Sequence, residues 1–298
     1  MADRICRLLD GMDIRRDVPL SQLTSFRIGG PAALTARPRN ADELRSVLHI
    51  CADLRYPLCV LGNGTNVLAP DAGFDGMIVQ MNLPITSPIY IDTLVTCPAG
   101  TLLSVLARDS VHNGLMGMEA LSGIPGTVGG AVAMNAGAYG GEIRYIIESV
   151  RVMYPDGSTA DVRCGHADFG YRRSAFCAPE TVVLSASFRL RRDDGGAKAR
   201  MNEYTDQRKR KQPLSLPSAG SVFKRPSGRF AGALIEEAGM KGASVGGAQV
   251  SPLHAGFIVN NGGATERDVR ELIRLVQERV YETSGVMLER ELKLLSEV

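Results

Sequence analysis

Two glycine-rich segments constrain the fold of this chain more than any other feature. The first, 62–66, reads Gly-Asn-Gly-Thr-Asn and directly follows an apolar run. The second, 123–130, reads Gly-Ile-Pro-Gly-Thr-Val-Gly-Gly and continues into small residues as far as 138. Glycine has no Cβ to hold a ligand away from the backbone, and exposed N–H groups in such loops bind anions. We therefore expect the two segments to cradle a flat, phosphorylated ligand.

Each segment also has a purely structural interpretation. The first is not the G-x-G-x-x-G fingerprint, because Val67 stands where the third glycine belongs, and a tight turn between strands would explain it equally well. The second could be a helix that packs tightly on a sheet through its small residues. Two glycine-rich segments in one domain are more than helix packing requires, so the ligand interpretation is favoured.

Composition restricts the class of protein. A chain of 298 residues suggests about two domains. A net charge of +2 is too small to indicate a nucleic-acid or membrane-surface partner. Six scattered cysteines without a C-x-x-C pair argue against a zinc site or a redox dithiol, so we predict no metal. The absence of a signal-like N-terminus and of a long apolar run predicts a cytoplasmic protein.

Periodicity predicts an α+β protein with mixed helices and strands. Apolar residues at helical spacing, with capping residues, predict four helices, and short apolar or alternating runs bounded by turns predict the strands. The helices are expected at about 40–51, 102–113, 230–238 and 265–284, and the strands at 57–61, 77–81, 94–97, 150–154, 160–162, 182–190 and 256–260.

The charged, glycine-bearing stretch 191–196 is the best candidate for a domain border. We therefore predict a first region at 1–192, with two subdomains at about 1–70 and 71–192, and a second domain at 193–298.

Six sequence blocks, taken in order, resemble one bacterial enzyme family. The blocks are TSFRIGGPA (24–32), GNGTNVL (62–68), ALSGIPGTVGGAVAMNAGAYG (120–140), YRRSAF (171–176), KQPLSLPSAGSVFKRP (211–226) and LERELK (288–293). Together they are similar to the UDP-N-acetylenolpyruvoylglucosamine reductase family of peptidoglycan-precursor enzymes. The chain is short and shows no tyrosine-bearing insertion before Lys211, which resembles the compact, type II branch.

The resemblance implies a fold, a cofactor and a reaction. The fold would be the vanillyl-alcohol-oxidase (PCMH-type) flavoprotein fold in two N-terminal parts, followed by a C-terminal substrate domain. NADPH would reduce noncovalently bound FAD, and the reduced FAD would reduce the enolpyruvyl ether of a UDP-amino sugar. No obligatory protein partner is inferred. FAD would contact residues of both glycine segments and of the small-residue run that follows. These are Gly62, Asn63, Gly64, Thr65, Asn66, Val67, Gly123, Ile124, Pro125, Gly126, Thr127, Gly129, Gly130, Asn135 and Gly137.

The same resemblance assigns three catalytic residues. Arg172 would stabilise the substrate carboxylate, Ser221 would protonate the enol intermediate, and Glu291 would assist. From the residues alone, a solvated arginine is the favoured interpretation of Arg172. A turn or capping serine is at least as good an interpretation of Ser221, and Glu291 is one of two acids on a strand face. A guanidinium suits a carboxylate because it offers two donors in a plane.

Three further residues would contact the substrate. Lys211 matches a lysine that contacts the UDP diphosphate, although its basic run is also typical of a solvated surface. Arg225 stands where some family members have asparagine, and Tyr171 either lines the substrate cleft or packs in the core.

Two other functions fit parts of the sequence. A flavin oxidase of alcohols or lactones on the same scaffold would use oxygen, although neither glycine segment contains a histidine for covalent flavin attachment. A non-catalytic module that binds nucleotide sugars would keep the basic run around Lys211 but would need no flavin.

Overall fold

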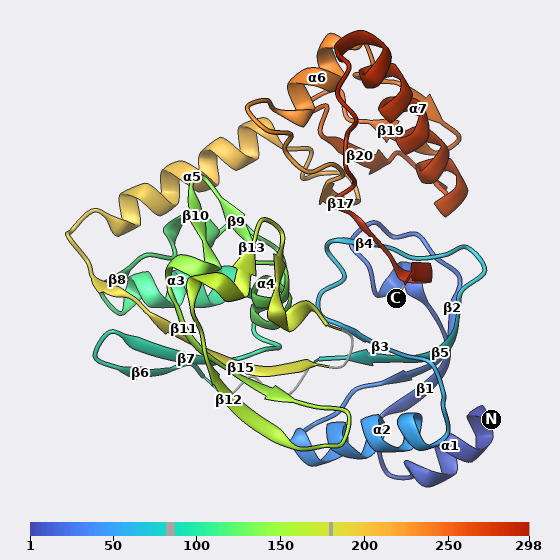
Figure 1. The fold of residues 1–298 in the computed structure, drawn as a ribbon, viewed down its shortest axis with the longest axis vertical. Coiled ribbons are helices and arrows are strands. Elements are labelled where there is room, and N and C mark those ends of the chain that lie inside the picture. Colours follow the sequence, from blue (N-terminus) through green and yellow to red (C-terminus); the bar gives the residue numbers. More distant parts are fainter. Residues whose placement is uncertain (82–86, 179–180, 298) are drawn as a thin grey trace. The chain divides into compact units, whose positions relative to one another are not determined.

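The computed structural model describes residues 1–81, 87–178 and 181–297, which form two compact units (Figure 1). Unit 1 comprises Met1–Arg16, Leu34–Asn63 and Asp75–Arg208. Unit 2 comprises Asp17–Ala33, Gly64–Phe74 and Lys209–Val298. The chain therefore passes between the units several times, and the first glycine segment itself contains one of the crossings.

The first sheet of unit 1 has the strand order β1-β2-β5-β3. Its strands are β1 (Ile14–Pro19), β2 (Pro31–Ala36), β5 (Phe74–Gln80) and β3 (Leu58–Leu61), and β3 pairs with β5 in parallel. The helices α1 (Ala2–Leu8) and α2 (Ala41–Asp53) share an apolar cluster with this sheet. The Asn40 side chain caps α2 by accepting from Glu43 N at 2.9 Å, as the sequence predicts.

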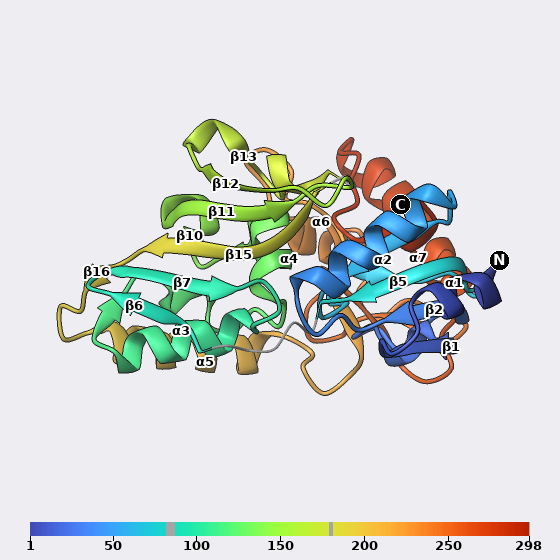
Figure 2. The ribbon, with the colours of Figure 1, turned by 90° about the horizontal axis from the view of Figure 1, so that it is seen from below.

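The second sheet of unit 1 has the order β12-β11-β15-β7-β6. Its strands are β12 (Thr159–Arg163), β11 (Ile147–Met153), β15 (Val182–Arg189), β7 (Leu94–Pro98) and β6 (Ile89–Ile91). The helix α3 (Leu103–His112) runs beneath β6 and β7 (Figure 2), and α4 (Val128–Ala133) packs on β15. The 150–162 hairpin and the 182–190 strand are confirmed as β11, β12 and β15.

Short ladders complete unit 1 and shape its loops. The pairs are β8 (Leu115–Met116) with β16 (Arg191–Arg192), β9 (Gly137–Ala138) with β10 (Gly141–Glu142), and β13 (Phe169–Gly170) with β14 (Arg173–Ser174). Single 3-10 turns occur at η2 (Glu119–Leu121), η3 (Ile143–Tyr145), η4 (His166–Asp168) and η5 (Ala175–Cys177).

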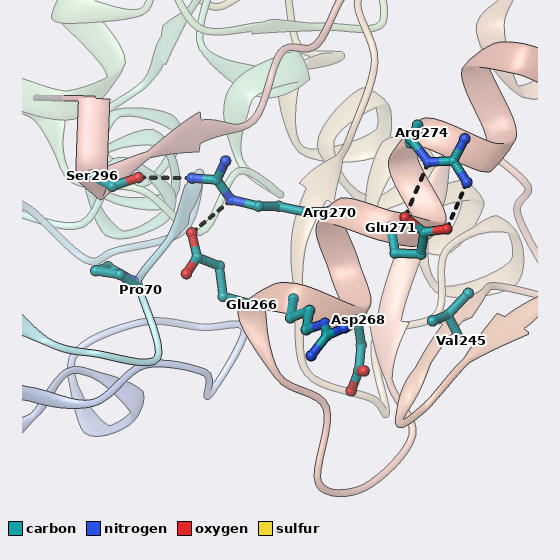
Figure 3. Close-up of a pocket in the computed structure, with 9 residues that line it drawn as sticks. Pro70, Val245, Glu266, Asp268, Arg270, Glu271, Arg274 and Ser296 are labelled. Atoms are coloured by element: carbon teal, nitrogen blue, oxygen red, sulfur yellow. Dashed lines mark hydrogen bonds and ion pairs between the residues drawn. The ribbon is translucent and has the colours of Figure 1, made fainter.

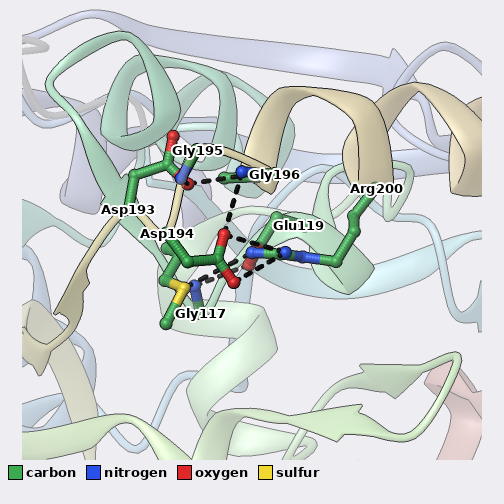
Figure 4. Close-up of polar contacts among 9 residues, drawn as sticks. Gly117, Glu119, Asp193, Asp194, Gly195, Gly196 and Arg200 are labelled. Atoms are coloured by element: carbon green, nitrogen blue, oxygen red, sulfur yellow. Dashed lines mark hydrogen bonds and ion pairs between the residues drawn. The ribbon is translucent and has the colours of Figure 1, made fainter.

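The border between the units falls between Arg208 and Lys209, inside α5 (Ala197–Lys211), and not at 192/193. Electrostatic contacts at the start of this helix give the reason (Figure 4). Arg200 binds Glu119 at 2.8 Å and Asp194 at 3.0 Å, and the Glu119 side chain is only 8% exposed. These contacts bind the first turns of α5 to unit 1. The assignment of FAD and substrate binding to 1–192 and 193–298 stays a prediction.

Unit 2 packs two helices on a four-stranded sheet. The sheet has the order β17 (Ser218–Ser221), β20 (Phe257–Asn260), β19 (Ala248–Val250) and β18 (Ser244–Val245). The helices are α6 (Ala231–Glu237) and α7 (Glu266–Ser284), with η1 (Leu20–Gln22) and η6 (Leu295–Glu297) as short turns. A parallel pair, β21 (Lys293–Leu294) with β4 (Val67–Leu68), connects the C-terminal segment to the residues that directly follow the first glycine segment.

The ends of α7 are those that the sequence predicts. Thr265 accepts from Asp268 N at 3.1 Å, while the Asp268 carboxylate accepts from Thr265 N at 3.0 Å, which completes a capping box. Gly285 ends the helix at φ 69°. The apolar stripe of the helix, Val269, Leu272, Ile273, Val276 and Val280, lies in the core of unit 2.

Removal of the Thr265 hydroxyl tests how much the helix cap contributes to the free energy of unfolding. We expect Thr265→Ala to lower the free energy of unfolding by about 1 kcal/mol, because the N–H of Asp268 loses its acceptor. Thr265→Ser keeps the acceptor and should lose much less. Urea unfolding of the three proteins measures this, and equal stability of Thr265→Ala and wild type would contradict the assigned cap.

Candidate active site

The two glycine segments meet within unit 1. Asn63 Nδ2 donates to Pro125 O at 2.7 Å, and a Cβ added to Gly62 would lie 2.5 Å from Thr127 Oγ1. Position 62 therefore has no space for a side chain unless Thr127 moves. The end of β3 and the loop before α4 form one surface, as the sequence predicts for a ligand cradle.

Backbone donors on this surface are available to a ligand. Within the described part of the chain, the N–H groups of Gly62, Asn63, Gly123, Gly126 and Thr127 donate no hydrogen bond to another residue. Polar N–H groups in folded proteins normally have partners, so a set of free donors on adjoining loops suits a group with many acceptor oxygens. The donor set fits the diphosphate of a dinucleotide such as FAD.

Other parts of the second segment have structural roles. The N–H groups of Val128 and Gly129 donate to Thr101 O at 2.8 Å and Ala99 O at 2.9 Å. A Cβ on Gly129 would lie 3.0 Å from Ala99 Cβ, so this glycine lets α4 pack closely on the preceding segment. The Thr127 hydroxyl caps α4 by accepting from Gly130 N at 3.3 Å. Ile124 packs against the apolar cluster of the second sheet.

In unit 2, the rest of the first segment lies against two other stretches of backbone. Gly64 has φ 58°, and a Cβ there would lie 2.2 Å from Leu23 O. Asn66 O accepts from Lys293 N at 3.0 Å, and Asn66 Nδ2 donates to Glu291 O at 3.4 Å. Val67 pairs with Lys293, and Thr65 is half-buried between these contacts. This half of the segment fixes the backbone around Glu291.

Arg172 occupies the turn of the β13–β14 hairpin in unit 1. Its φ is 55°, a left-handed conformation that costs a non-glycine residue of the order of 1 kcal/mol or more. Its Nη2 donates to Gly137 O at 3.1 Å, and its guanidinium lies 5.0 Å from the centre of the Tyr171 ring. Tyr171 is 44% exposed, so it is not a core residue. Strained turns of this kind cluster at functional sites.

Asn135 supports this turn from inside the protein. Its side chain is fully buried, and Nδ2 donates to Gly170 O and to Glu142 Oε2, both at 2.9 Å. Its Oδ1 accepts from Arg144 N at 3.1 Å. The structure thus accounts for all polar atoms of the Asn135 side chain by protein contacts, next to the hairpin that carries Arg172.

Replacement of Asn135 tests this arrangement. We expect Asn135→Ala to lower the free energy of unfolding by roughly 1–3 kcal/mol, because a buried carbonyl and a buried N–H lose their partners. Asn113→Ala is the matched control, since Asn113 is exposed and bonds only Asp109 O. Urea unfolding compares the two variants, and an equal loss in both would count against the proposed support.

Ser221 and Glu291 lie on adjacent segments of unit 2. Glu291 N donates to Val222 O at 2.8 Å, and Phe223 forms an isolated antiparallel bridge with Arg290. The strand expected around Glu289 and Glu291 is therefore a single bridge. The β17–β20 register shifts between Ser218 and Ser221, where Gly220 has φ 76°. Bulges of this kind re-aim a side chain. In the described residues, the Ser221 hydroxyl makes no hydrogen bond.

Lys211 and Arg225, the predicted substrate cations, are both exposed. Lys211 is the last residue of α5, where a cation also interacts favourably with the helix dipole. The Arg225 guanidinium lies 4.4 Å from the centre of the Phe230 ring, and Phe230 is 62% exposed.

Sequence reasoning assigned no individual role to four further residues. Tyr139 and Tyr204 stack with ring centres 4.8 Å apart, and Arg208 lies one helical turn after Tyr204. The Oε1 atom of Gln212 is buried without a hydrogen-bond partner among the described residues. The helices expected from the sequence do not include α5, so the i, i+4 spacing of Tyr204 and Arg208 is informative only once that helix is established.

A surface pocket of unit 2 lies beside the start of α7 (Figure 3) and is not lined by any of the predicted site residues. Two of its three arginines already have partners: Arg270 binds Glu266 at 2.7 Å and Ser296 at 2.9 Å, and Arg274 binds Glu271 at 2.6 Å.

Comparison with known proteins identifies the family. A model of the FAD binding domain matches residues 32–163, and one of the C-terminal domain of UDP-N-acetylenolpyruvoylglucosamine reductase matches residues 212–295. The chain is 42% identical to the UDP-N-acetylenolpyruvoylglucosamine reductase of Clostridioides difficile over 294 residues, which cover 98% of this chain and 97% of that protein. The chain belongs to the UDP-N-acetylenolpyruvoylglucosamine reductase family.

Other relatives extend this result over the whole chain. The reductase of Caldicellulosiruptor bescii is 44% identical over 96% of this chain and 92% of its own length. The crystal structure of the Thermus caldophilus reductase matches with a TM-score of 0.82 at 36% identity, covering 95% of this chain and 99% of that one. The predicted family and the α+β fold class, with an FAD-binding region before a C-terminal domain, are confirmed. In the described residues, no helix combines the length and apolar character needed to cross a bilayer.

Proposed function

We propose that this chain reduces the enolpyruvyl ether of UDP-N-acetylglucosamine enolpyruvate to UDP-N-acetylmuramate, with FAD as cofactor and NADPH as reductant, in peptidoglycan precursor synthesis. The observation that carries the proposal is the likeness to named reductases along nearly the whole chain, at 42% identity over 98% of its length. The match to an FAD-binding model at 32–163 supports the cofactor.

Five backbone N–H groups would hold the FAD diphosphate, those of Gly62, Asn63, Gly123, Gly126 and Thr127. FAD, when bound, would supply a carrier that accepts hydride from NADPH and passes it to the enolpyruvyl double bond of the substrate. No histidine occurs in either glycine segment, which supports noncovalent binding.

Arg172 binds the substrate carboxylate in this proposal. Hydride addition to the double bond develops negative charge on the carbon conjugated to that carboxylate, and a fixed guanidinium stabilises such charge. The bond from Arg172 to Gly137 O and the strained hairpin turn support a fixed orientation for this side chain. Tyr171, stacked on the guanidinium, restricts its movement further.

Ser221 then donates a proton to the carbon next to the substrate carboxylate, which completes the lactyl ether. Glu291 assists from the neighbouring segment. The absence of a protein partner for the Ser221 hydroxyl, within the described residues, supports a role toward a ligand. Lys211 and Arg225 bind the UDP portion of the substrate as exposed cations.

Reduced thiols support a cytoplasmic location as part of this proposal. All six cysteines are free, as expected in a reducing compartment. Burial raises the pKa of the Cys51, Cys59 and Cys97 thiols to about 11, so these thiols stay protonated and unreactive at neutral pH.

The proposed reaction can be tested directly with the purified holoenzyme. We expect NADPH oxidation that depends on the enolpyruvyl sugar nucleotide, with a product heavier than the substrate by two hydrogens in the mass spectrum. Anaerobic conditions should leave the rate unchanged. NADPH oxidation that consumes oxygen and ignores the sugar nucleotide would support a flavin oxidase instead.

The proton donor is tested by Ser221→Ala. We expect reduction of the sugar nucleotide to slow by roughly 10² to 10⁴, the usual contribution of a positioned acid, while flavin reduction by NADPH is unaffected. Ser218→Ala, on the same strand, is the control, because among the described residues the Ser218 hydroxyl forms no hydrogen bond, while its backbone oxygen accepts from Ser25 Oγ. Rapid-mixing kinetics in which Ser221→Ala slows both half-reactions equally would contradict the role.

A further inference from the structure

Glu142 contacts two residues that hold the turn of Arg172, namely Gly137 and Asn135. It pairs with Gly137 across the β9–β10 hairpin, and a Cβ on Gly137 would lie 2.6 Å from Glu142 Cγ. The absence of a side chain at Gly137 therefore lets the Glu142 side chain lie over this residue. The carbonyl oxygen of Gly137 accepts from Arg172 Nη2 at 3.1 Å, so Glu142 packs on the residue that binds the guanidinium.

The carboxylate of Glu142 also reaches the backbone of the Arg172 turn through Asn135. Glu142 Oε2 accepts from Asn135 Nδ2 at 2.9 Å, and the same Nδ2 donates to Gly170 O at 2.9 Å. Gly170 lies two residues before Arg172, in the β13–β14 hairpin. The backbone and the guanidinium of Arg172 are thus each connected to Glu142 through one intervening residue.

The charge of Glu142 helps to fix the orientation of the Asn135 amide. A carboxylate only accepts hydrogen bonds, so it must face the NH₂ group of Asn135 and not its oxygen. Arg144 Nε lies 2.9 Å from the same Oε2 atom, and Arg144 N donates to Asn135 Oδ1 at 3.1 Å. The Glu142 side chain is only 20% exposed, so these charged contacts are partly shielded from water and hold the amide firmly.

Backbone contacts already form the β9–β10 hairpin. Its two strands pair through their backbones, and just beyond them Ile143 N donates to Ala136 O at 3.0 Å. A side chain that only supported the hairpin could be neutral or apolar. A carboxylate that contacts Asn135 suits a different role, the orientation of Arg172.

We propose that Glu142 is a positioning residue that orients the Arg172 guanidinium toward the carboxylate of the enolpyruvyl substrate. The inference rests on the proposed function, in which Arg172 binds that carboxylate. Glu142 acts through Asn135 on the backbone of the turn and through Gly137 on the guanidinium, without itself touching the substrate. Displacement of a catalytic group by about 1 Å can slow a reaction by the order of 10², so such a residue can affect the rate from a distance.

Two ligands that differ only in the enolpyruvyl group test this role by calorimetry on the oxidised holoenzyme. We expect Glu142→Ala to weaken the enolpyruvyl sugar nucleotide by about 10-fold, and UDP-N-acetylglucosamine, which has no carboxylate, by less than about twofold. Glu142→Gln keeps an oxygen that can accept from Asn135 and should weaken the first ligand by only about threefold. The matched control is Glu148→Gln, which removes the carboxylate of another ion pair of unit 1, with Arg189 at 3.4 Å, and should leave both affinities unchanged.

A double-mutant cycle separates positioning of Arg172 from general support of the fold. We expect single-turnover reduction of the sugar nucleotide to slow by about 10- to 100-fold in Glu142→Ala, with flavin reduction by NADPH unaffected. In an Arg172→Lys background, Glu142→Ala should slow the reaction by less than about threefold, because the guanidinium that it orients is already gone. Losses that multiply in the double variant would overturn the inference, as would an equal weakening of the two ligands or no effect on either.

Should Glu142→Ala fail to fold, Glu142→Gln provides the same comparison of ligands. Failure of the proposed function has a different signature, because wild type would then neither reduce the enolpyruvyl sugar nucleotide nor prefer it to UDP-N-acetylglucosamine. In that case hydrogen exchange of the apoprotein decides the positioning role. We expect peptides that contain 170–174 to exchange faster in Glu142→Ala than in wild type or Glu148→Gln, and unchanged exchange would overturn the inference.

Discussion

The contact between the end of β3 and the loop before α4 is the constraint on which unit 1 depends. Gly62 lies against Thr127, and Asn63 binds Pro125 O, 62 residues later in the chain, so two distant segments form one surface. Thr127 also caps α4, and Gly129 packs that helix on Ala99. The same loop therefore fixes the packing of α4, and its remaining N–H groups are available as donors to a phosphorylated ligand.

Unit 2 uses backbone irregularity for a similar purpose. Gly220 introduces a bulge in β17 immediately before Ser221, and the segment with Glu291 lies beside that strand through its bond to Val222 O. The core beneath is built from α6, α7 and the sheet. A rigid support with a bulged strand on it suits a proton donor, because it limits the positions that the hydroxyl can occupy. Arg172 in unit 1 is held similarly, by a strained turn above the buried Asn135.

Sequence reasoning predicted the features that local patterns determine. The Asn40 cap, the α7 capping box and the alternation in β15 follow from side-chain chemistry and period, and all three occur. Features that depend on distant partners could not be found in this way. Arg200 extends unit 1 into α5 because Glu119, 81 residues earlier, is its partner. The contacts of Asn135 with Gly170 and of Gly129 with Ala99 are of this kind, while the contact of both residues with FAD stays a prediction. Arg208 looked like part of a solvated run until its contact with Gly123 was seen.

Amide hydrogen exchange of the apoprotein, with and without added FAD, tests most directly whether the unit 1 loops hold the dinucleotide. Free N–H groups exchange rapidly, and a bound diphosphate should protect them. We expect slower exchange in peptides that contain 62–63 and 123–127 when FAD is added, with peptides from α2 unchanged. Stoichiometric FAD binding that leaves exchange in both loops unaltered would contradict the account.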